Sequence, residues 1–212
     1  MTDTGGSWPI IGFANATADD VYIYATGSNA PARLTLENSK TLTVTNNTGS
    51  NVQVGGSTSQ TGFLLLDQGT LTTYTLNIEP NSYAQILSGS YATAYTGVGI
   101  YGSSSANSYL ELESVGPGPQ TDLAVGTMTL SATGTGQANF NWYEGSLSIS
   151  TLILQSGGTF NWEPIGTTTS VSLAGTNKLG GGVFNIISGA GLTLTGSVQD
   201  YSGAGTLYKD GP

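Results

Sequence analysis

Carboxylates are the side chains in this sequence best suited to catalysis, and they form two candidate pairs. Glu111 and Glu113 lie two residues apart, on one face of a predicted strand, and Glu144 and Glu163 are expected to stack on successive repeats. Two carboxylates within roughly 5–10 Å of each other can cleave a glycosidic bond. Because leucines alternate with Glu111 and Glu113, however, we expect this pair simply to face water.

Other catalytic groups are scarce. The chain has no histidine and no cysteine, which excludes the usual serine triad and a thiolate metal site. Polysaccharide lyases of the β-helix type rely on a basic residue as proton acceptor, and only Arg33, Lys40, Lys178 and Lys209 are basic. We therefore predict that the protein is not an enzyme, and we predict no catalytic residue.

No cofactor is expected either. Calcium would find oxygen ligands at Asp19 and Asp20, or at Asp200 with Asp210. These residues match neither an EF-hand loop nor the calcium-binding nonapeptide of β-helices. We interpret them as solvated turn carboxylates and predict no metal site.

A phrase of alternating aromatic and amide residues occurs three times, beginning at residues 140, 160 and 184. Alternation on a strand predicts that its flanking residues point inward and its asparagine outward. Stacked repeats would then align the rings in the core and the asparagines in an amide ladder. The predicted structural stack consists of Phe140, Trp142, Phe160, Trp162, Phe184 and Ile186 with Asn141, Asn161 and Asn185.

Two alternative surfaces compete with this interpretation. Trp142, Tyr143 and Trp162 would form a sugar-stacking platform if they were exposed, which the alternation disfavours. Thr-x-Thr pairs begin at residues 41, 70, 127 and 193, and such pairs suit an ice-binding face. Their starts share no common period, so the sequence does not predict that they align at one position of a repeat.

The period of the repeated phrase indicates stacked repeats, and we predict an all-β fold, a β-solenoid of parallel strands with about nine or ten coils. An antiparallel β-sandwich is the alternative, because short strands recur at regular spacing. The strands are predicted at residues 21–24, 34–36, 42–44, 52–54, 63–66, 74–78, 83–86, 110–112, 123–125, 147–149, 171–173 and 192–194.

Two segments break the pattern. Residues 88–108 are rich in glycine, serine and tyrosine and are predicted to be less regular, and residues 115–119 (Val-Gly-Pro-Gly-Pro) are predicted to form a loop. We divide the chain into two parts. Residues 1–115 are predicted to form coils with a possible N-terminal cap at residues 8–11, and residues 116–212 are predicted to form the coils that contain the repeated phrase. Because strands resume after the loop, the two parts are expected to form one continuous domain.

Composition narrows the class of partner. Thirteen acidic and four basic residues give a formal net charge of −9, which disfavours nucleic acid and anionic membrane surfaces. No apolar run approaches the roughly 18 residues of a membrane helix, so no membrane insertion of this segment is expected. The first residues do not resemble a signal peptide, which predicts either its removal or another export route.

Residues 203–211 (Gly-Ala-Gly-Thr-Leu-Tyr-Lys-Asp-Gly) resemble the Gly-x-Gly-Thr-Leu-x-Lys-x-Gly phrase of autotransporter passenger repeats. Residues 158–161 and 189–194 look like the strand phrases that precede it in that family. The resemblance implies a right-handed parallel β-helix, secreted or displayed on the surface of a Gram-negative bacterium, and often adhesive. An excised fragment of a longer chain would explain the lack of a signal peptide and a membrane barrel.

Together these observations predict a non-enzymatic structural protein of the cell surface, either an adhesin stalk or a filament-forming segment. Its expected partners are a second copy of itself, or a glycan or protein of a host surface. The alternatives are a carbohydrate-binding or polysaccharide-degrading β-helix protein, and an ice-binding β-solenoid.

Overall fold

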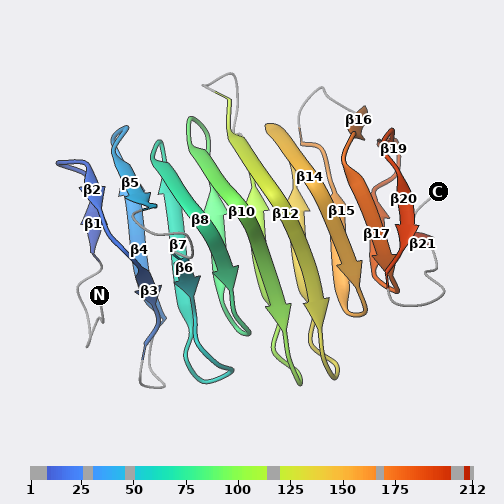
Figure 1. Cartoon of the computed structure of the whole chain (residues 1–212), viewed down its shortest axis with the longest axis horizontal. Helices are drawn as coiled ribbons and strands as arrows, with labels where there is room; N and C mark the ends of the chain where they lie inside the picture. Colours follow the sequence, from blue (N-terminus) through green and yellow to red (C-terminus); the bar gives the residue numbers. More distant parts are fainter. Residues whose placement is uncertain are drawn as a thin grey trace.

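The computed structural model describes residues 9–25, 31–45, 51–113, 120–165, 170–201 and, by their backbone, 208–210. These residues form strands, turns and irregular segments, without a helix. The strands build two long sheets that face each other, and the chain advances along the long axis from its N-terminus to its C-terminus (Figure 1). The all-β prediction is therefore confirmed.

The nine-stranded sheet contains one strand from each passage of the chain through that layer. Its strands, in the order in which they are hydrogen-bonded, are β1 (Ile10–Ile11), β4 (Ala32–Glu37), β7 (Gly62–Asp67), β9 (Tyr83–Ile86), β11 (Ser108–Leu112), β13 (Ala138–Trp142), β15 (Gly158–Trp162), β18 (Val183–Ile186) and β21 (Tyr208–Asp210).

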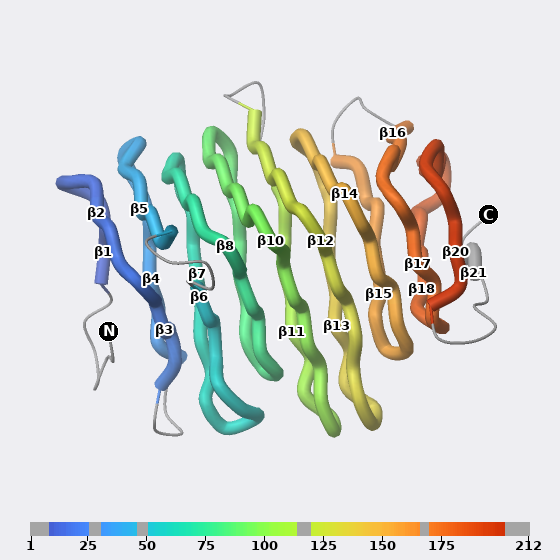
Figure 2. Tube along the Cα trace, viewed as in Figure 1, coloured from blue at the N-terminus to red at the C-terminus, as the bar shows by residue number. Residues whose placement is uncertain are grey.

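The ten-stranded sheet forms the second layer, and Figure 2 shows the chain alternating between the two. Its main path runs through β2 (Ala16–Thr17), β5 (Thr41–Val44), β8 (Thr70–Ile78), β10 (Tyr91–Gly102), β12 (Asp122–Ala132), β14 (Ser146–Gln155), β17 (Thr176–Gly180) and β20 (Val198–Asp200). Two further strands, β3 (Val21–Ile23) and β6 (Asn51–Val54), pair with each other and extend this sheet beside β8. A separate pair joins β16 (Ser170–Leu173) to β19 (Gly191–Leu194).

Every pairing between these named strands is parallel, as β7 with β9 and β12 with β14 illustrate. The antiparallel β-sandwich is therefore wrong. Hairpins would have placed consecutive strands side by side in one sheet, but here most consecutive strands lie in opposite sheets. The arrangement is compatible with the predicted solenoid.

A bend divides the ten-stranded sheet into two halves. The short strands β5 and β6 pair with successive parts of β8, and the register of β10 shifts between Ala94 and Gly97. Backbones approach closely at this bend: a Cβ on Gly126 would lie 2.3 Å from the carbonyl oxygen of Tyr95. Only glycine fits such a position, so Gly126 permits the close approach of the backbones at the bend.

The core lies between the two sheets and consists of the inward residue of each alternating pair. Leu36, Leu66, Ile100 and Leu130 are among its fully buried members. The segment predicted to be irregular, residues 88–108, contains the twelve-residue strand β10, so that prediction is wrong. Its inward residues include Ala92 and Ala94, and their small size hid the alternation from a search for large apolar residues.

The boundary proposed between residues 115 and 116 and the loop at 115–119 fall outside the described residues, apart from their flanks. On either side of them, β10 pairs with β12 and β11 pairs with β13, so both sheets continue across this point. The cap expected at residues 8–11 is described only from Pro9 onward, where Ile10 and Ile11 form β1.

Candidate functional site

The aromatic residues of the repeated phrase lie in the core, aligned strand by strand. Phe140 pairs with Phe160, and Phe160 with Phe184, with ring centroids 5.1 and 5.6 Å apart. Trp142 and Trp162 follow at a centroid distance of 4.7 Å, and Ile186 occupies the next register position.

Both tryptophans are buried, with exposed fractions of 3% and 1%. An exposed sugar-stacking platform at Trp142 and Trp162 is therefore wrong, because alternation turns both indole rings toward the opposite sheet. The indole nitrogen of Trp142 donates to the carbonyl oxygen of Gly145 at 3.2 Å.

The asparagines of the phrase point outward and form a hydrogen-bonded row on the nine-stranded sheet. Asn185 donates to Asn161 at 2.8 Å, Asn161 donates to Asn141 at 2.8 Å, and Asn141 donates to Glu111 at 3.1 Å. Gln85, in the next strand, donates to Glu111 at 3.4 Å. We call these five residues the amide row.

A second row lies two residues earlier in β9 and β11 and continues into β7, which has no member of the amide row. Phe63, Tyr83 and Tyr109 are aligned in β7, β9 and β11, with ring centroids separated by 5.1 and 6.3 Å. The guanidinium of Arg33 extends the row at 4.9 Å from the centre of the Phe63 ring, a cation–π contact. We call Phe63, Tyr83 and Tyr109 the aromatic row.

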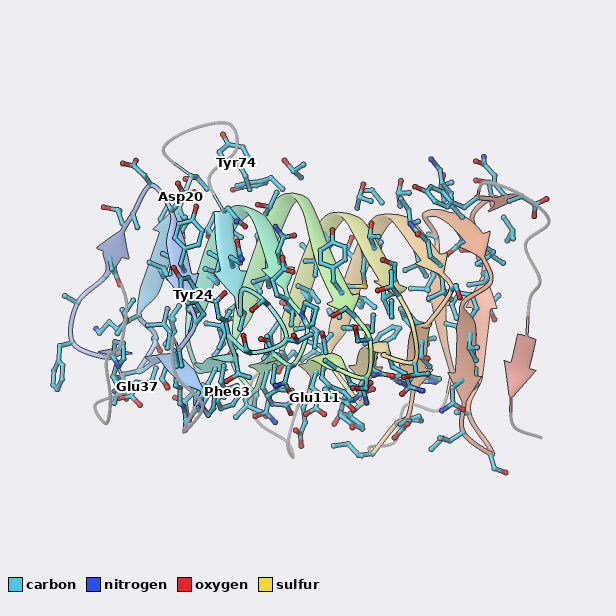
Figure 3. All side chains as sticks on the ribbon, turned by 90° about the horizontal axis from the view of Figure 1, so that it is seen from below. Asp20, Tyr24, Glu37, Phe63, Tyr74 and Glu111 are labelled. Carbon is cyan, nitrogen blue, oxygen red and sulfur yellow. The ribbon has the colours of Figure 1, made fainter. Side chains whose placement is uncertain are left out.

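The two rows are joined at Glu111. The Tyr83 hydroxyl donates a hydrogen bond to the Glu111 carboxylate, which also accepts from Gln85 and Asn141. Figure 3 places Phe63 and Glu111 on one side of the molecule, opposite Tyr74, which belongs to the other sheet. A continuous outer face of aromatic, amide and carboxylate side chains therefore covers the nine-stranded sheet.

Two tyrosines on this face hold their protons more tightly than usual. Burial, reinforced by the hydrogen bond to Glu111, raises the pKa of Tyr83. Burial and the nearby carboxylates of Glu111 and Glu163 raise the pKa of Tyr143 to about 12. Both side chains therefore carry an O–H donor at neutral pH.

Asn139 extends the aromatic row beyond Tyr109, with which it is paired in β13. Its side chain is only 7% exposed, and its Nδ2 atom has no hydrogen-bond partner among the described residues. A buried amide without a partner is costly, and because this nitrogen is closed to solvent, the cost falls on stability and is not relieved by a ligand at the surface.

The structure brings together only one of the two predicted carboxylate pairs. The carboxylates of Glu111 and Glu113 both lie 3.4 Å from the amide nitrogen of Gln85. Glu144 and Glu163 do not share a register position, because Trp142 pairs with Trp162, so that Tyr143 comes level with Glu163. The expected stacking of Glu144 on Glu163 is wrong for that reason.

Among the described residues, no three acidic side chains gather where they would hold a metal ion. Asp20 accepts a hydrogen bond from the backbone nitrogen of Asn51 at 2.9 Å and so ties two circuits together. The Asp210 side chain lies outside the described residues. Calcium binding at Asp19 and Asp20, or at Asp200 and Asp210, stays a hypothesis.

The sequence analysis missed the aromatic row, because it counted outward residues of alternating strands as solvated. A signal was present: Phe63, Tyr83 and Tyr109 each stand one residue before a core residue of the nine-stranded sheet, which predicts that each ring points outward. What the sequence could not show was that these strands are adjacent.

Comparison with family models, with curated proteins and with solved structures gave no match for this chain. Within the part of the chain that the structure describes, no helix is sufficiently long and apolar to span a membrane. The functional argument therefore depends on the outer faces themselves.

Proposed function

We propose that this protein is a non-enzymatic, exported β-solenoid that binds a carbohydrate chain along the outer face of its nine-stranded sheet. In this proposal the fold is a right-handed parallel β-helix of about nine coils, and the protein acts as a surface adhesin. Secretion, display on a Gram-negative cell and kinship with autotransporter passengers belong to the same proposal.

The strand order supports the solenoid. Strands of the two long sheets alternate along most of the chain, and each long sheet is parallel throughout its named strands. The chain leaves each sheet and returns to it as a strand parallel to the previous one. Repeating this step winds the backbone into a helix whose turns are made of strands. Such crossovers are right-handed in nearly all proteins, because strands themselves twist in that sense.

The observation that carries carbohydrate binding is that an aromatic row lies directly beside a hydrogen-bonding row. The apolar faces of sugar rings stack on aromatic side chains, and their hydroxyls pair with amides and carboxylates. Successive strands of the face stand about 4.8 Å apart, a spacing comparable with one sugar unit of an extended chain. A linear glycan lying across the strands would meet an aromatic ring beside a polar group at β9 and β11, a ring alone at β7, and polar side chains alone at β13 and β15.

The negative charge of the outer face of the nine-stranded sheet determines which class of glycan it can bind. Glu37, Glu111, Glu113 and Glu163 lie on the strands of the nine-stranded sheet or immediately after them, whereas Arg33 is the only basic residue of its described strands up to β18. Anionic polysaccharides would be repelled by these carboxylates. We therefore expect a neutral or amine-bearing glycan.

Two substitutions on the face test this proposal. Replacing Asn139 by valine removes the buried Nδ2 atom, so stability should rise by about 1 kcal/mol, while glycan binding should be unchanged because that atom is closed to solvent. Tyr83→Ala should abolish binding, whereas Tyr91→Ala, at an exposed position of the other sheet, should leave it unchanged.

The measurement is a glycan array, followed by calorimetric titration of the best neutral or amine-bearing ligand, with circular dichroism to confirm folding. Binding that is unaffected by Tyr83→Ala would refute the proposed face. Incubation with the same glycans also tests the absence of enzyme activity, since the appearance of shorter products would show that Glu111 or Glu113 acts catalytically.

End-to-end assembly into filaments is a second candidate function, favoured by the N-terminal end of the fold. A cavity of about 270 Å³ opens there, lined mainly by apolar side chains that include Ile11, Val21 and Leu42. Within the described residues β1 pairs only with β4, which leaves one edge of the sheet available. Electron microscopy of the purified protein should show filaments, and uniform short particles would exclude assembly.

A further inference from the structure

Threonines on the outer face of the ten-stranded sheet are aligned in columns across neighbouring strands. Thr17, Thr43, Thr72 and Thr93 occupy one register position in the neighbouring strands β2, β5, β8 and β10. Thr41 and Thr70 are aligned in the same way, two residues earlier in β5 and β8. Six threonines therefore form a grid of two columns, which we call the threonine grid.

This alignment corrects one expectation from the sequence. The Thr-x-Thr pairs beginning at residues 41 and 70 do occupy the same position of the repeat, because circuits of unequal length still keep the strands in register. The pair beginning at 127 lies beyond the bend, on the other half of the sheet, and Thr193 lies in the separate pair of strands. Only part of the threonine pattern therefore forms one surface.

The hydroxyls of the threonine grid are available to an external partner. Within the described ranges, none of the six side chains hydrogen-bonds to another protein group, and each is at least partly exposed. This differs from the amide row, where each asparagine donates to its neighbour. The grid thus presents hydroxyl groups that the fold itself does not use.

The grid is also held rigidly. Between its columns and beside them, Leu42, Leu71 and Ala92 point inward and are nearly fully buried, which anchors each strand to the core. Threonine is β-branched and has few χ1 rotamers, so binding orders little additional side-chain freedom. The columns repeat at about 4.8 Å across strands and about 6.8 Å along a strand.

Charge is absent from the grid. The outward residues of β5 and β8 in this half are all threonines, and the first charged residue in either column is Asp122 in β12. A charged or strongly cationic ligand would therefore gain nothing here. The surface suits a neutral, periodic partner that both donates and accepts hydrogen bonds.

We infer that the threonine grid binds the ordered water of an ice surface. Each hydroxyl can donate to and accept from a lattice water, while each methyl group packs against the surface. The regular, rigid spacing allows several weak contacts to form together, and this explains how short neutral side chains would hold a crystal lattice. This inference is independent of the glycan proposal, since it concerns the opposite sheet.

The test is partition of the purified full chain into slowly grown ice, measured as the ratio of protein concentration in ice to that in the remaining liquid. Thr43→Lys with Thr72→Lys should reduce this ratio about tenfold, because two contacts are replaced by charged side chains. Thr159→Lys, on the outer face of the nine-stranded sheet, is the matched control and should leave the ratio unchanged.

A second variant tests whether a lower ratio in the lysine variant is caused by misfolding. Thr43→Val with Thr72→Val keeps the shape of the grid and suits a strand, and it should also lower the partition ratio by removing two hydroxyls. The inference is overturned if the wild-type protein is excluded from ice as serum albumin is, or if the lysine and valine variants of Thr43 and Thr72 partition like the wild type. Retained glycan binding by the grid variants would show that the two faces act separately.

Discussion

The two outer faces of this molecule are built on the same backbone geometry but treat their polar groups differently. On the nine-stranded sheet, Asn141, Asn161 and Glu111 are bonded to one another across strands. On the ten-stranded sheet, the hydroxyls of the threonine grid have no such partners among the described residues. The amide side chains reach the neighbouring strand at the interstrand spacing of about 4.8 Å, whereas the short threonine side chains remain directed at solvent.

One fold can therefore have one outer face whose polar side chains hydrogen-bond to each other and another whose polar side chains remain available to solvent. A row of amides contributes to stability by bonding along the sheet, as in other stacked β-structures. The threonines of the grid favour the strand conformation, and their hydroxyls remain available to bind an external partner. The comparison predicts that mutations on the two faces will differ in their cost to stability.

The largest effect should come from the core that both faces share. Phe160 is fully buried between Phe140 and Phe184, so Phe160→Ala should lower the free energy of unfolding by about 3–5 kcal/mol. Urea denaturation measures this change, with Thr159→Ala as the neighbouring outward control. A loss below that of the control would mean that the aligned rings do not organise the fold.

Two outward substitutions, one on each sheet, compare how much the polar side chains of the two faces contribute to stability. Asn161 donates to Asn141 and accepts from Asn185, so Asn161→Ala should cost about 1–3 kcal/mol of unfolding free energy. Thr72→Val removes a hydroxyl without a partner and should change stability by less than about 0.5 kcal/mol. Equal losses from both, measured by thermal and urea unfolding, would remove the contrast between the faces.

The smallest expected effect is a pH dependence to which Tyr83 and Tyr143 contribute, together with Tyr101 in β10, whose pKa burial also raises. Because the folded pKa values of Tyr83 and Tyr143 are raised, their stabilising contribution is complete below pH about 10 and is lost as the pH rises toward 12. The melting temperature should therefore fall over this range, less steeply in Tyr83→Phe with Tyr143→Phe. A slope unaltered by the double variant would contradict this account.

Much of the strand pattern could be predicted from the sequence, because alternation depends only on the polarity of adjacent residues. The strands at 34–36, 42–44 and 52–54 lie within β4, β5 and β6. Strand β10 could not be identified in this way, since its inward alanines and many glycines give a weak apolar signal.

The candidate sites were less accessible from the sequence. The amide row was visible because its three asparagines belong to a repeated phrase. The aromatic row and the threonine grid were not, because their members stand at unequal spacings: Phe63, Tyr83 and Tyr109 in one face, Thr17, Thr43, Thr72 and Thr93 in the other.

The sequence alone thus determined the strand-rich composition, the inward position of Phe140 and Phe160, and the acidic character of the chain. Only the tertiary structure decided which strands are neighbours, and therefore which outward side chains gather into a surface. The physical reason is that loops of different length join successive circuits, while hydrogen bonding between parallel strands restores the register. Spacing along the chain consequently does not report spacing across the sheet.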